Sequence, residues 1–179
     1  MSKLVHEGKI PNIGISNFSA YQIELVIKYF DIYACQANYS ILHRQVESNT
    51  LQLCKDKGIK FYAYQPLESG LLTGKFFPVG NRILANSDWR NRSPLFSNKS
   101  LDYFTDLNVV LNSIATRNLV TVASISLAWV TKNSNCDVAL FGVRDLSQLL
   151  IVRDSMKVNL TARDRFLIDQ SIQGFLSHD

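Results

Sequence analysis

The sequence predicts an α/β fold in which four short strands form a parallel sheet with helical crossovers. Apolar segments of strand length alternate along the chain with segments of helical periodicity, a pattern typical of βαβ units. Two strand segments, within residues 14–18 and 61–75, continue directly into polar, glycine-bearing loops. Such loops lie at the carboxyl ends of parallel strands, where α/β proteins bind their ligands.

The four predicted strands are short and mostly apolar, as expected for strands that are buried in a parallel sheet. Turn residues or helical segments separate each strand from the next, so that every connection is long enough for a crossover. The predicted strands cover residues 12–16, 32–38, 59–64 and 137–141.

The predicted helices are marked by their ends and by apolar positions three or four residues apart. Ser19 and Gln22 form an S-x-x-Q capping box at the start of the first helix. Gly58 has the position of the C′ residue after a helix over residues 49–57. Ser100 is expected to cap a later helix. Further helices are expected after Thr121, over residues 146–152, and after a capping box at residues 161–164.

Composition limits the possible classes of function. A hydrophobic fraction of 46% and a charged fraction of 19% are typical of a folded protein, and the length suits a single domain over residues 1–179. The net charge of +4 is spread along the chain, without a basic run interleaved with aromatics, so nucleic-acid binding is not expected. A phosphate-bearing ligand is compatible with this charge. The long irregular segment over about residues 66–99 is of a kind that is usually functional or mobile.

The cysteines and histidines favour neither a metal site nor disulfides. Cys35, Cys54 and Cys136 are odd in number and widely spaced, which indicates a reducing, cytoplasmic location. No two histidines have metal-ligand spacing, so no metal is predicted. No signal peptide or membrane-spanning segment is evident, and no association with a membrane is expected. The common nucleotide-binding and hydrolase motifs are absent from the sequence as well.

Polar and aromatic residues at the predicted strand ends suit a flat ring that bears an amide. Ser16 and Asn17 follow the first strand, Gln36 lies in the second, and Tyr64 ends the third. Side-chain amides can pair with a carboxamide, and a tyrosine face can stack on a ring. Each residue also has a simpler interpretation: turn chemistry for Ser16 and Asn17, a satisfied buried amide for Gln36, and a core aromatic for Tyr64.

Four segments carry a family resemblance over about residues 6–160. They are E-G-K-I-x-x-I-G-I-S-N-F, C-Q-A-N-Y-S-I-L-H-R-Q-V-E, G-I-K-F-Y-A-Y-Q-P-L-E-S-G-L-L-T-G-K-F and L-F-G-V-R-x-x-x-Q-L. Together they resemble the second half of an aldo-keto reductase. Within that family, three motifs are similar to the aflatoxin-aldehyde and succinic-semialdehyde reductase branch. They are R-Q-V-E, the segment over residues 61–75, and W-R-N-R. The resemblance implies a partial TIM (β/α)₈ barrel of about four β/α units, namely its second half. It also implies an NADP(H)-dependent oxidoreductase that reduces aldehydes or ketones by hydride transfer without a metal.

The resemblance implies a cofactor site in two parts. Ser16, Asn17 and Gln36 would hold the nicotinamide carboxamide, and Tyr64 would stack on the nicotinamide ring. The remaining positions would contact the other end of NADP: Leu67, Ser69 and Lys75 along the pyrophosphate, Arg144 at the 2′-phosphate, and Gln148 near the adenine. Arg90 and Arg92 of the long loop would lie near the cofactor phosphates or an acidic substrate, although solvated loop charges are the alternative.

The sequence also departs from the family pattern. Gln65 stands where Ser or Asn is usual, Phe141 where Pro is frequent, and Ile151 and Val152 replace a polar pair that holds adenine. The family's catalytic Asp, Tyr, Lys and His belong to its first four strands, and no residue here matches them, so no catalytic residue is assigned. Tyr39 aligns with a different strand.

Half a barrel is expected to leave apolar surface and two sheet edges exposed. The sequence therefore predicts a chain that pairs with itself or a relative, or is poorly stable, with negligible turnover when isolated. The alternatives are a non-catalytic module that binds NADP or another protein, and a degraded gene product.

Overall fold

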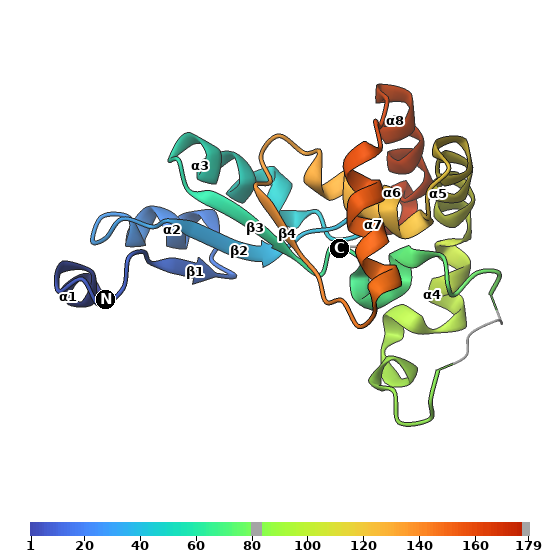
Figure 1. The fold of residues 1–179 in the computed structure, drawn as a ribbon, viewed down its shortest axis with the longest axis horizontal. Coiled ribbons are helices and arrows are strands. Elements are labelled where there is room, and N and C mark those ends of the chain that lie inside the picture. The colour runs from blue at the N-terminus through green and yellow to red at the C-terminus, as the bar shows by residue number, and fades with distance from the viewer. Residues whose placement is uncertain (80–83, 177–179) are drawn as a thin grey trace. The chain divides into compact units, whose positions relative to one another are not determined.

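The computed structural model describes residues 1–79 and 84–176, which divide into two compact units (Figure 1). The sheet unit consists of Met1–Pro66 and Val130–Phe141, and the helical unit consists of Leu67–Trp129 and Gly142–Asp179 as far as it is described. A single domain over residues 1–179 stays a prediction.

The sheet unit contains a four-stranded parallel sheet in the order β1-β2-β3-β4, which confirms the predicted α/β fold with a parallel sheet of four strands. In register, Ser16 pairs with Gln36, and Asn38 pairs with Tyr64. The carboxyl ends of the first three strands therefore lie side by side. The strands are slightly shorter than predicted: β1 (Gly14–Ser16), β2 (Ala34–Asn38), β3 (Lys60–Tyr64) and β4 (Val138–Leu140).

Alternation along the strands separates a packed face of the sheet from an open one. On the packed face, Cys35, Phe61 and Ala63 are completely buried, and α3 packs against β3. Their strand neighbours Gln36 and Tyr64 point to the opposite face and are only half-buried. Candidate site residues thus extend from a sheet whose other face is fixed by apolar packing.

The helices of the sheet unit begin and end largely where the sequence predicts. Ser19 and Gln22 form the expected capping box, with both reciprocal hydrogen bonds present. Gly58 has φ +67°, the left-handed conformation expected after a helix. The elements are α1 (Ser2–His6), which was not predicted, α2 (Ala20–Val26), the 3₁₀ helix η1 (Gln45–Ser48) and α3 (Thr50–Asp56).

The helical unit opens with the irregular segment and continues with helices. Its 3₁₀ turns are η2 (Glu68–Thr73), η3 (Trp89–Arg92) and η4 (Pro94–Phe96). Residues 80–83 of the predicted loop lie outside the described residues. The α-helices are α4 (Asn98–Tyr103), α5 (Thr105–Asn118), α6 (Val122–Thr131), which ends in the sheet unit, α7 (Leu146–Lys157), α8 (Ala162–Ser171) and α9 (Gln173–Leu176).

One predicted helix start is wrong. Ser97, not Ser100, caps α4: its hydroxyl accepts from the Ser100 amide at 3.2 Å, while the Ser100 hydroxyl donates to the Pro94 carbonyl at 2.7 Å. The predicted continuous helix is also interrupted at Phe104, where α4 ends and α5 begins. Two serines three residues apart both fit a cap, and the preceding 3₁₀ turn decides between them.

In the helical unit α5 is in contact with α8, and the apolar side chains Leu107 and Leu111 of α5 and Ile168 of α8 are buried. Arg117 of α5 donates to Asp164 of α8 at 2.7 Å. Within residues 1–79 and 84–176, no single helix is long and apolar enough to cross a membrane. Only α5 and α6 pass that test as a pair, and they are bent by 93°.

Candidate functional site

The predicted ring-binding residues come together at the carboxyl end of the sheet. Asn17 follows β1 in a left-handed conformation, with φ 60°. Its backbone amide donates to the backbone carbonyl of Gln36 at 2.8 Å. The Tyr64 hydroxyl donates to Asn17 Oδ1 at 3.0 Å, which joins the ends of β1 and β3 across β2. Ser16 pairs with Gln36 in the sheet register. Hydroxyl, amide and aromatic groups from three strands are therefore adjacent.

Asn38 is a further member of this group that sequence reasoning missed. It lies two residues after Gln36 on the same face of β2, opposite Tyr64 in register. Its Oδ1 atom is buried, and among the described residues it has no hydrogen-bond partner. A buried acceptor without a partner is costly, so a donor from a bound molecule would satisfy it. The period-two alternation from Gln36 was the signal that could have identified Asn38.

Tyr39 lies next to this group but faces the core. Its hydroxyl donates to Glu47 at 2.6 Å and accepts from Asn133 at 2.7 Å, and the side chain is fully buried. Burial, together with the Glu47 carboxylate, raises the pKa of Tyr39 above its ordinary value. A hydroxyl held in this way links η1 to the segment before β4, and it does not face the open side of the sheet.

In the helical unit, the predicted pyrophosphate residues form a tight turn at η2. Glu68, Ser69 and Gly70 have positive φ in succession, with values of 45°, 53° and 98°. For residues other than glycine this conformation costs roughly 1–2 kcal/mol each. The Leu67 carbonyl accepts from the Gly70 and Leu72 amides at 2.9 and 3.2 Å. Successive amides in a turn of this kind can form an anion-binding concavity.

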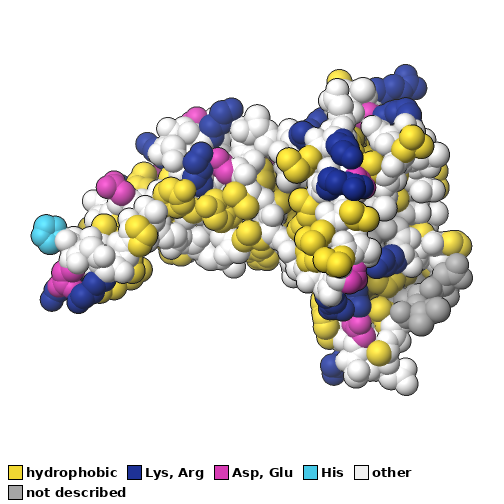
Figure 2. Space-filling model, in the orientation of Figure 1, with side chains coloured by type: hydrophobic (Ala, Val, Ile, Leu, Met, Phe, Trp, Pro, Cys, Tyr) yellow, Lys and Arg dark blue, Asp and Glu magenta, His cyan; other side chains and the backbone are white. Residues whose placement is uncertain are grey.

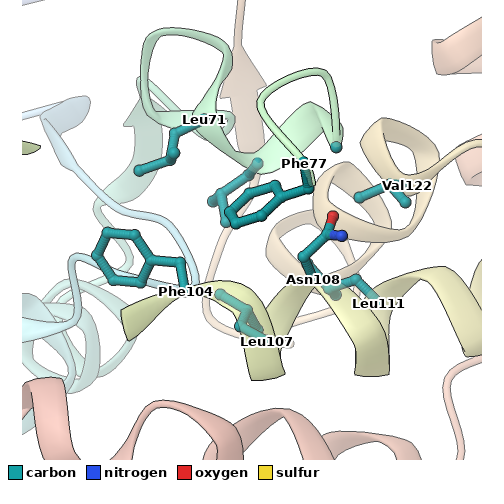
Figure 3. A pocket seen from close by; sticks show the side chains of 9 residues that line it. Leu71, Phe77, Phe104, Leu107, Asn108, Leu111 and Val122 are labelled. Carbon is teal, nitrogen blue, oxygen red and sulfur yellow. The ribbon is translucent and has the colours of Figure 1, made fainter. Parts of the chain in front are cut away.

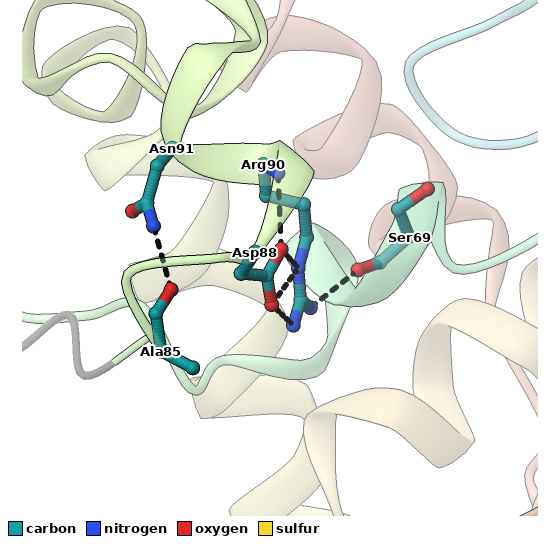
Figure 4. A network of polar contacts seen from close by, with 5 residues as sticks. All are labelled: Ser69, Ala85, Asp88, Arg90 and Asn91. Atoms are coloured by element: carbon teal, nitrogen blue, oxygen red, sulfur yellow. Dashed lines mark hydrogen bonds and ion pairs between the residues drawn. The ribbon is translucent and has the colours of Figure 1, made fainter.

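Arg90 lies beside this turn and is held by protein groups (Figure 4). It donates from Nη1 to the Ser69 carbonyl at 3.0 Å and from Nη2 to Asp88 Oδ2 at 2.6 Å. These bonds from Arg90 hold the pKa of Asp88 at about 2. Arg92, on the same 3₁₀ helix, is exposed. Of the two predicted arginines, the structure brings Arg90 to Ser69, one of the residues predicted to lie along a pyrophosphate.

The start of α7 holds the predicted 2′-phosphate and adenine residues. The Gln148 side chain accepts from the Arg144 amide at 2.8 Å, and Asp145 caps the helix by accepting from the Gln148 amide at 3.1 Å. Hydrogen bonds from Ser147 and the Gln148 amide, together with the charge of Lys75, lower the pKa of Asp145. Lys75 and Arg144 are both exposed, so their charges can reach a ligand.

An apolar cleft under the η2 turn is too small for a substrate (Figure 3). Its free volume of about 10 Å³ corresponds to roughly one water molecule. Phe77 and Leu71 come from one side of the cleft and Leu107 and Leu111 from α5, so it is a packing contact that supports the turn. Over residues 1–79 and 84–176, no cluster of His, Cys, Asp and Glu could hold a metal ion.

The predicted site residues therefore form two groups, and the groups lie in different units. The ring group is Ser16, Asn17, Gln36 and Tyr64, with Asn38 added by the structure. The phosphate group is Leu67, Ser69, Lys75, Arg144 and Gln148, with Arg90 attached to it through Ser69.

Comparison with known proteins identifies the family. The model of the aldo/keto reductase family matches residues 1–173. The chain belongs to the aldo/keto reductase family, which confirms the predicted family.

Curated relatives are similar over nearly the whole chain. The NADH-specific methylglyoxal reductase of Escherichia coli is 33% identical over 172 residues, covering 94% of this chain and 50% of the relative. An aldo-keto reductase of Bacillus subtilis is 28% identical, covering 99% of this chain and 53% of the relative. A probable aldo-keto reductase of Glycine max is 29% identical, covering 92% and 46%. The chain thus spans about half the length of the curated relatives it matches.

Solved structures agree on the fold. A glycerol dehydrogenase of Gluconobacter oxydans matches with a TM-score of 0.85 and 25% identity, covering 95% of this chain and 51% of that one. A thermostable aldo-keto reductase in complex with the inhibitor epalrestat matches with a TM-score of 0.67 and 23% identity, covering 96% and 52%. The second likeness concerns the fold alone.

Proposed function

We propose that this chain is the cofactor-binding half of an NADP(H)-dependent reductase of aldehydes or ketones, in the aflatoxin-aldehyde and succinic-semialdehyde reductase branch. Its two units would belong to one domain, the second half of a (β/α)₈ barrel. The observation that carries the proposal is the convergence of Ser16, Asn17, Gln36 and Tyr64 at three adjacent strand ends.

These strand-end groups suit the nicotinamide of the cofactor. Ser16 and Gln36 provide a hydroxyl and an amide for its carboxamide, and Asn17 retains its amide nitrogen because Tyr64 uses only its Oδ1. The buried, unpartnered Oδ1 of Asn38 would accept from the carboxamide nitrogen. The bond to Asn17 also fixes the orientation of the Tyr64 ring, as a stacking platform requires. When bound, the cofactor supplies the hydride.

Proton delivery is the part of the reaction for which the described residues offer no candidate. Tyr39 is buried, bonded to Glu47 and Asn133, and its pKa is raised, so it is unsuited to protonate a carbonyl oxygen. We propose that the proton donor comes from the complementary half of the family barrel, in the same polypeptide or in another. The second candidate function is a non-catalytic module that binds NADP. It is favoured because the described residues offer no candidate for the proton donor.

The preference for NADP over NAD rests on Arg144. A charged hydrogen bond to a 2′-phosphate contributes about 1.5–3 kcal/mol, which is roughly tenfold or more in affinity. The neighbouring carboxylate of Asp145 opposes this preference, and the E. coli relative is named as NADH-specific. Wild type is expected to bind NADPH at least about tenfold more tightly than NADH, and Arg144→Ala to lose the difference. Equal binding by wild type would contradict the NADP assignment.

Exposed apolar side chains support pairing of this chain with itself or with a relative. Leu146, Leu149 and Leu150 are exposed on α7 by 81%, 49% and 47%, and hydrophobic side chains are visible over this helix in Figure 2. Such neighbouring apolar groups mark interaction surfaces. Sedimentation is expected to detect association at micromolar concentration, whereas a compact monomer that melts cooperatively would contradict it.

We place the protein in the cytoplasm because its three cysteines are unpaired.

The test of cofactor binding is titration with NADPH, followed by nicotinamide fluorescence and by the thermal melt. Wild type is expected to bind, and Tyr64→Ala to weaken binding about fivefold or more because stacking of a ring on an aromatic side chain contributes roughly 1–3 kcal/mol. Tyr64→Phe keeps the ring face and should retain most of the affinity. Tyr29→Ala, at a tyrosine that is 76% exposed, is the matched control.

A wild-type chain that shows no change in fluorescence or melting with NADPH would refute the cofactor site. Turnover of an aldehyde separates the two candidate functions. The isolated chain is expected to show negligible turnover, and addition of a complementary half that carries the proton donor should restore it. Binding without restored turnover would favour the non-catalytic module.

A further inference from the structure

The η2 turn depends on a contact from outside its own segment. Glu68, Ser69 and Gly70 are all left-handed, although only one of them is a glycine. Within the turn, the Thr73 hydroxyl donates to the Gly70 carbonyl at 2.6 Å. The Ser69 carbonyl instead accepts from Arg90 Nη1 at 3.0 Å, a residue that lies 21 positions later in the sequence.

The guanidinium group of Arg90 is held from several sides. Its Nε donates to both oxygens of Asp88, at 3.0 and 3.2 Å, in addition to the Nη2 bond at 2.6 Å. Its Cζ atom lies 5.8 Å from the ring centre of Phe76 and 6.0 Å from that of Phe96. The Arg90 and Asp88 side chains are only 20% and 18% exposed. The arginine is thus fixed before any ligand binds.

This arrangement differs from that of an arginine poised to bind a phosphate directly. The adjacent Asp88 carboxylate neutralises the charge of Arg90, and the fork of the guanidinium faces protein oxygens (Figure 4). The pKa of Asp88 is about 2, because Arg90 stabilises its ionised form, so the pair stays charged at neutral pH. Lys75 and Arg144 of the same unit are exposed, so their charges remain available to an anion.

We propose that Arg90 is a positioning residue for the pyrophosphate of the cofactor. It holds the Ser69 carbonyl, and thereby the left-handed turn, so that the backbone of the turn is preorganised for the anion, while Asp88 holds Arg90 in place. The inference rests on the proposed function, because it assumes that a dinucleotide binds at the η2 turn. Preorganisation of this kind raises affinity because the turn does not have to be ordered on binding.

The experiment distinguishes direct phosphate binding by Arg90 from positioning of the turn. The two roles predict opposite changes in the Kd for NADPH when Asp88 is substituted. If Arg90 contacted the phosphates directly, Asp88→Asn would free its charge and NADPH would bind more tightly. If Arg90 positions the turn, Asp88→Asn loosens it, and the Kd for NADPH rises about tenfold, as loss of a charge-assisted hydrogen bond implies.

Substitution of Arg90 by lysine provides a second test of the two roles. Lysine binds phosphates as a point charge but cannot bond Asp88 and the Ser69 carbonyl through one planar fork. Arg90→Lys is therefore expected to weaken NADPH binding as much as Asp88→Asn does, whereas a direct contact would be largely rescued. Arg163→Lys on α8, at an exposed arginine, is the matched control and should leave the Kd unchanged.

The readouts separate positioning from general damage and from failure of the proposed function. Bound NADPH should keep its wild-type emission maximum in all variants, because the ring group is unaltered, and each variant should melt cooperatively without nucleotide. Tighter binding by Asp88→Asn, or rescue by Arg90→Lys, would overturn the positioning role alone. Absence of NADPH binding by wild type would overturn the proposed function, and the positioning role with it.

Discussion

The sheet unit and the helical unit hold their candidate residues by different physical means. In the sheet unit, Gln36 and Tyr64 are placed by regular parallel pairing over a face where Phe61 and Cys35 are fully buried. In the helical unit, Ser69 is placed by a strained turn, and its carbonyl is held by Arg90.

The difference indicates which part of the site tolerates change. Apolar packing is not directional, so a sheet fixes its strand ends as long as its volume is filled. A turn that is held by an arginine fork depends on the geometry of a few atoms. We therefore expect core substitutions to affect the stability of the sheet unit, and polar substitutions to affect ligand affinity in the helical unit.

The largest expected effect is in the sheet core. Phe61→Ala removes a fully buried ring from β3 and should lower the free energy of unfolding by about 3–5 kcal/mol. Urea titration followed by circular dichroism measures it. Phe166→Ala on α8, where the ring is 57% exposed, is the control and should change stability by less than about 0.5 kcal/mol.

Tryptophan emission makes the comparison sharper, because the two tryptophans, Trp89 and Trp129, both lie in the helical unit. If the two units unfold as one, Phe61→Ala shifts the emission midpoint together with the dichroism midpoint. Separate midpoints would show that the units are independent in stability.

A smaller effect is expected at the α5–α8 contact. Asp164 accepts from Arg117 at 2.7 Å and from the Thr161 amide and hydroxyl, and its side chain is almost fully buried. Asp164→Asn should cost about 1.5–3 kcal/mol, the range for hydrogen bonds to a charged group. Urea titration followed by tryptophan emission measures the loss. A change below about 0.5 kcal/mol would show that helix packing alone holds the unit.

The same carboxylate predicts a pH dependence. Burial raises the pKa of Asp164, but its bonds to Arg117 and Thr161 outweigh burial and lower the pKa below the ordinary value. Its stabilisation is therefore complete above about pH 4, the usual aspartate pKa, and is lost as pH falls through the lowered value. Wild type should lose stability below pH 4 more steeply than Asp164→Asn. Parallel curves would contradict this assignment.

Tyr39→Phe tests whether the sheet unit also depends on a polar contact. The substitution keeps the ring but leaves Glu47 and Asn133 without the hydroxyl, at an expected cost of about 1–2 kcal/mol. Thermal melting measures the loss. Tyr39 faces away from the open face of the sheet, so the Tyr39→Phe variant should bind NADPH with the affinity of wild type. A large fall in that affinity would assign Tyr39 to the candidate site.

The smallest expected effect is a gain. Gln65 follows β3 with φ 53°, a left-handed conformation that asparagine tolerates better than glutamine. Gln65→Asn should raise the free energy of unfolding by about 0.5–1 kcal/mol. Asn17, which already has φ 60° after β1, is the internal precedent. A loss of stability would mean that the Gln65 side chain makes a contact worth more than the strain.

The sequence predicted the sheet unit better than the helical unit for a physical reason. Apolar strands and the Ser19 capping box are local patterns, and parallel pairing then places Ser16, Gln36 and Tyr64 side by side. The choice of Ser97 over Ser100 as a cap depended on the preceding 3₁₀ turn.

The turn at η2 was harder to predict. Neither Glu68 nor Ser69 is a residue type that indicates a left-handed conformation, and their partner Arg90 is distant in sequence. The charge and position of Arg90 made it a candidate for phosphate binding. Its hydrogen bonds to Asp88 and to the Ser69 carbonyl could be seen only in the three-dimensional structure. Asn38 was within reach of sequence reasoning, since it repeats the strand alternation of Gln36.

Asp137 joins β4 to β3 at one end of this sheet, which matters for protein engineering. Its amide donates to the Phe61 carbonyl at 3.0 Å, and its carboxylate accepts from the Phe61 amide at 2.8 Å, at the end of the sheet opposite the candidate site. This two-bond clasp sets how β4 slides along β3, and Tyr64 follows three residues later, opposite Leu140. The register of β4 on β3 is therefore set at the end of the sheet away from the candidate site, so a change of loop at the site end does not alter it as long as the spacing between Asp137 and the last strand is preserved.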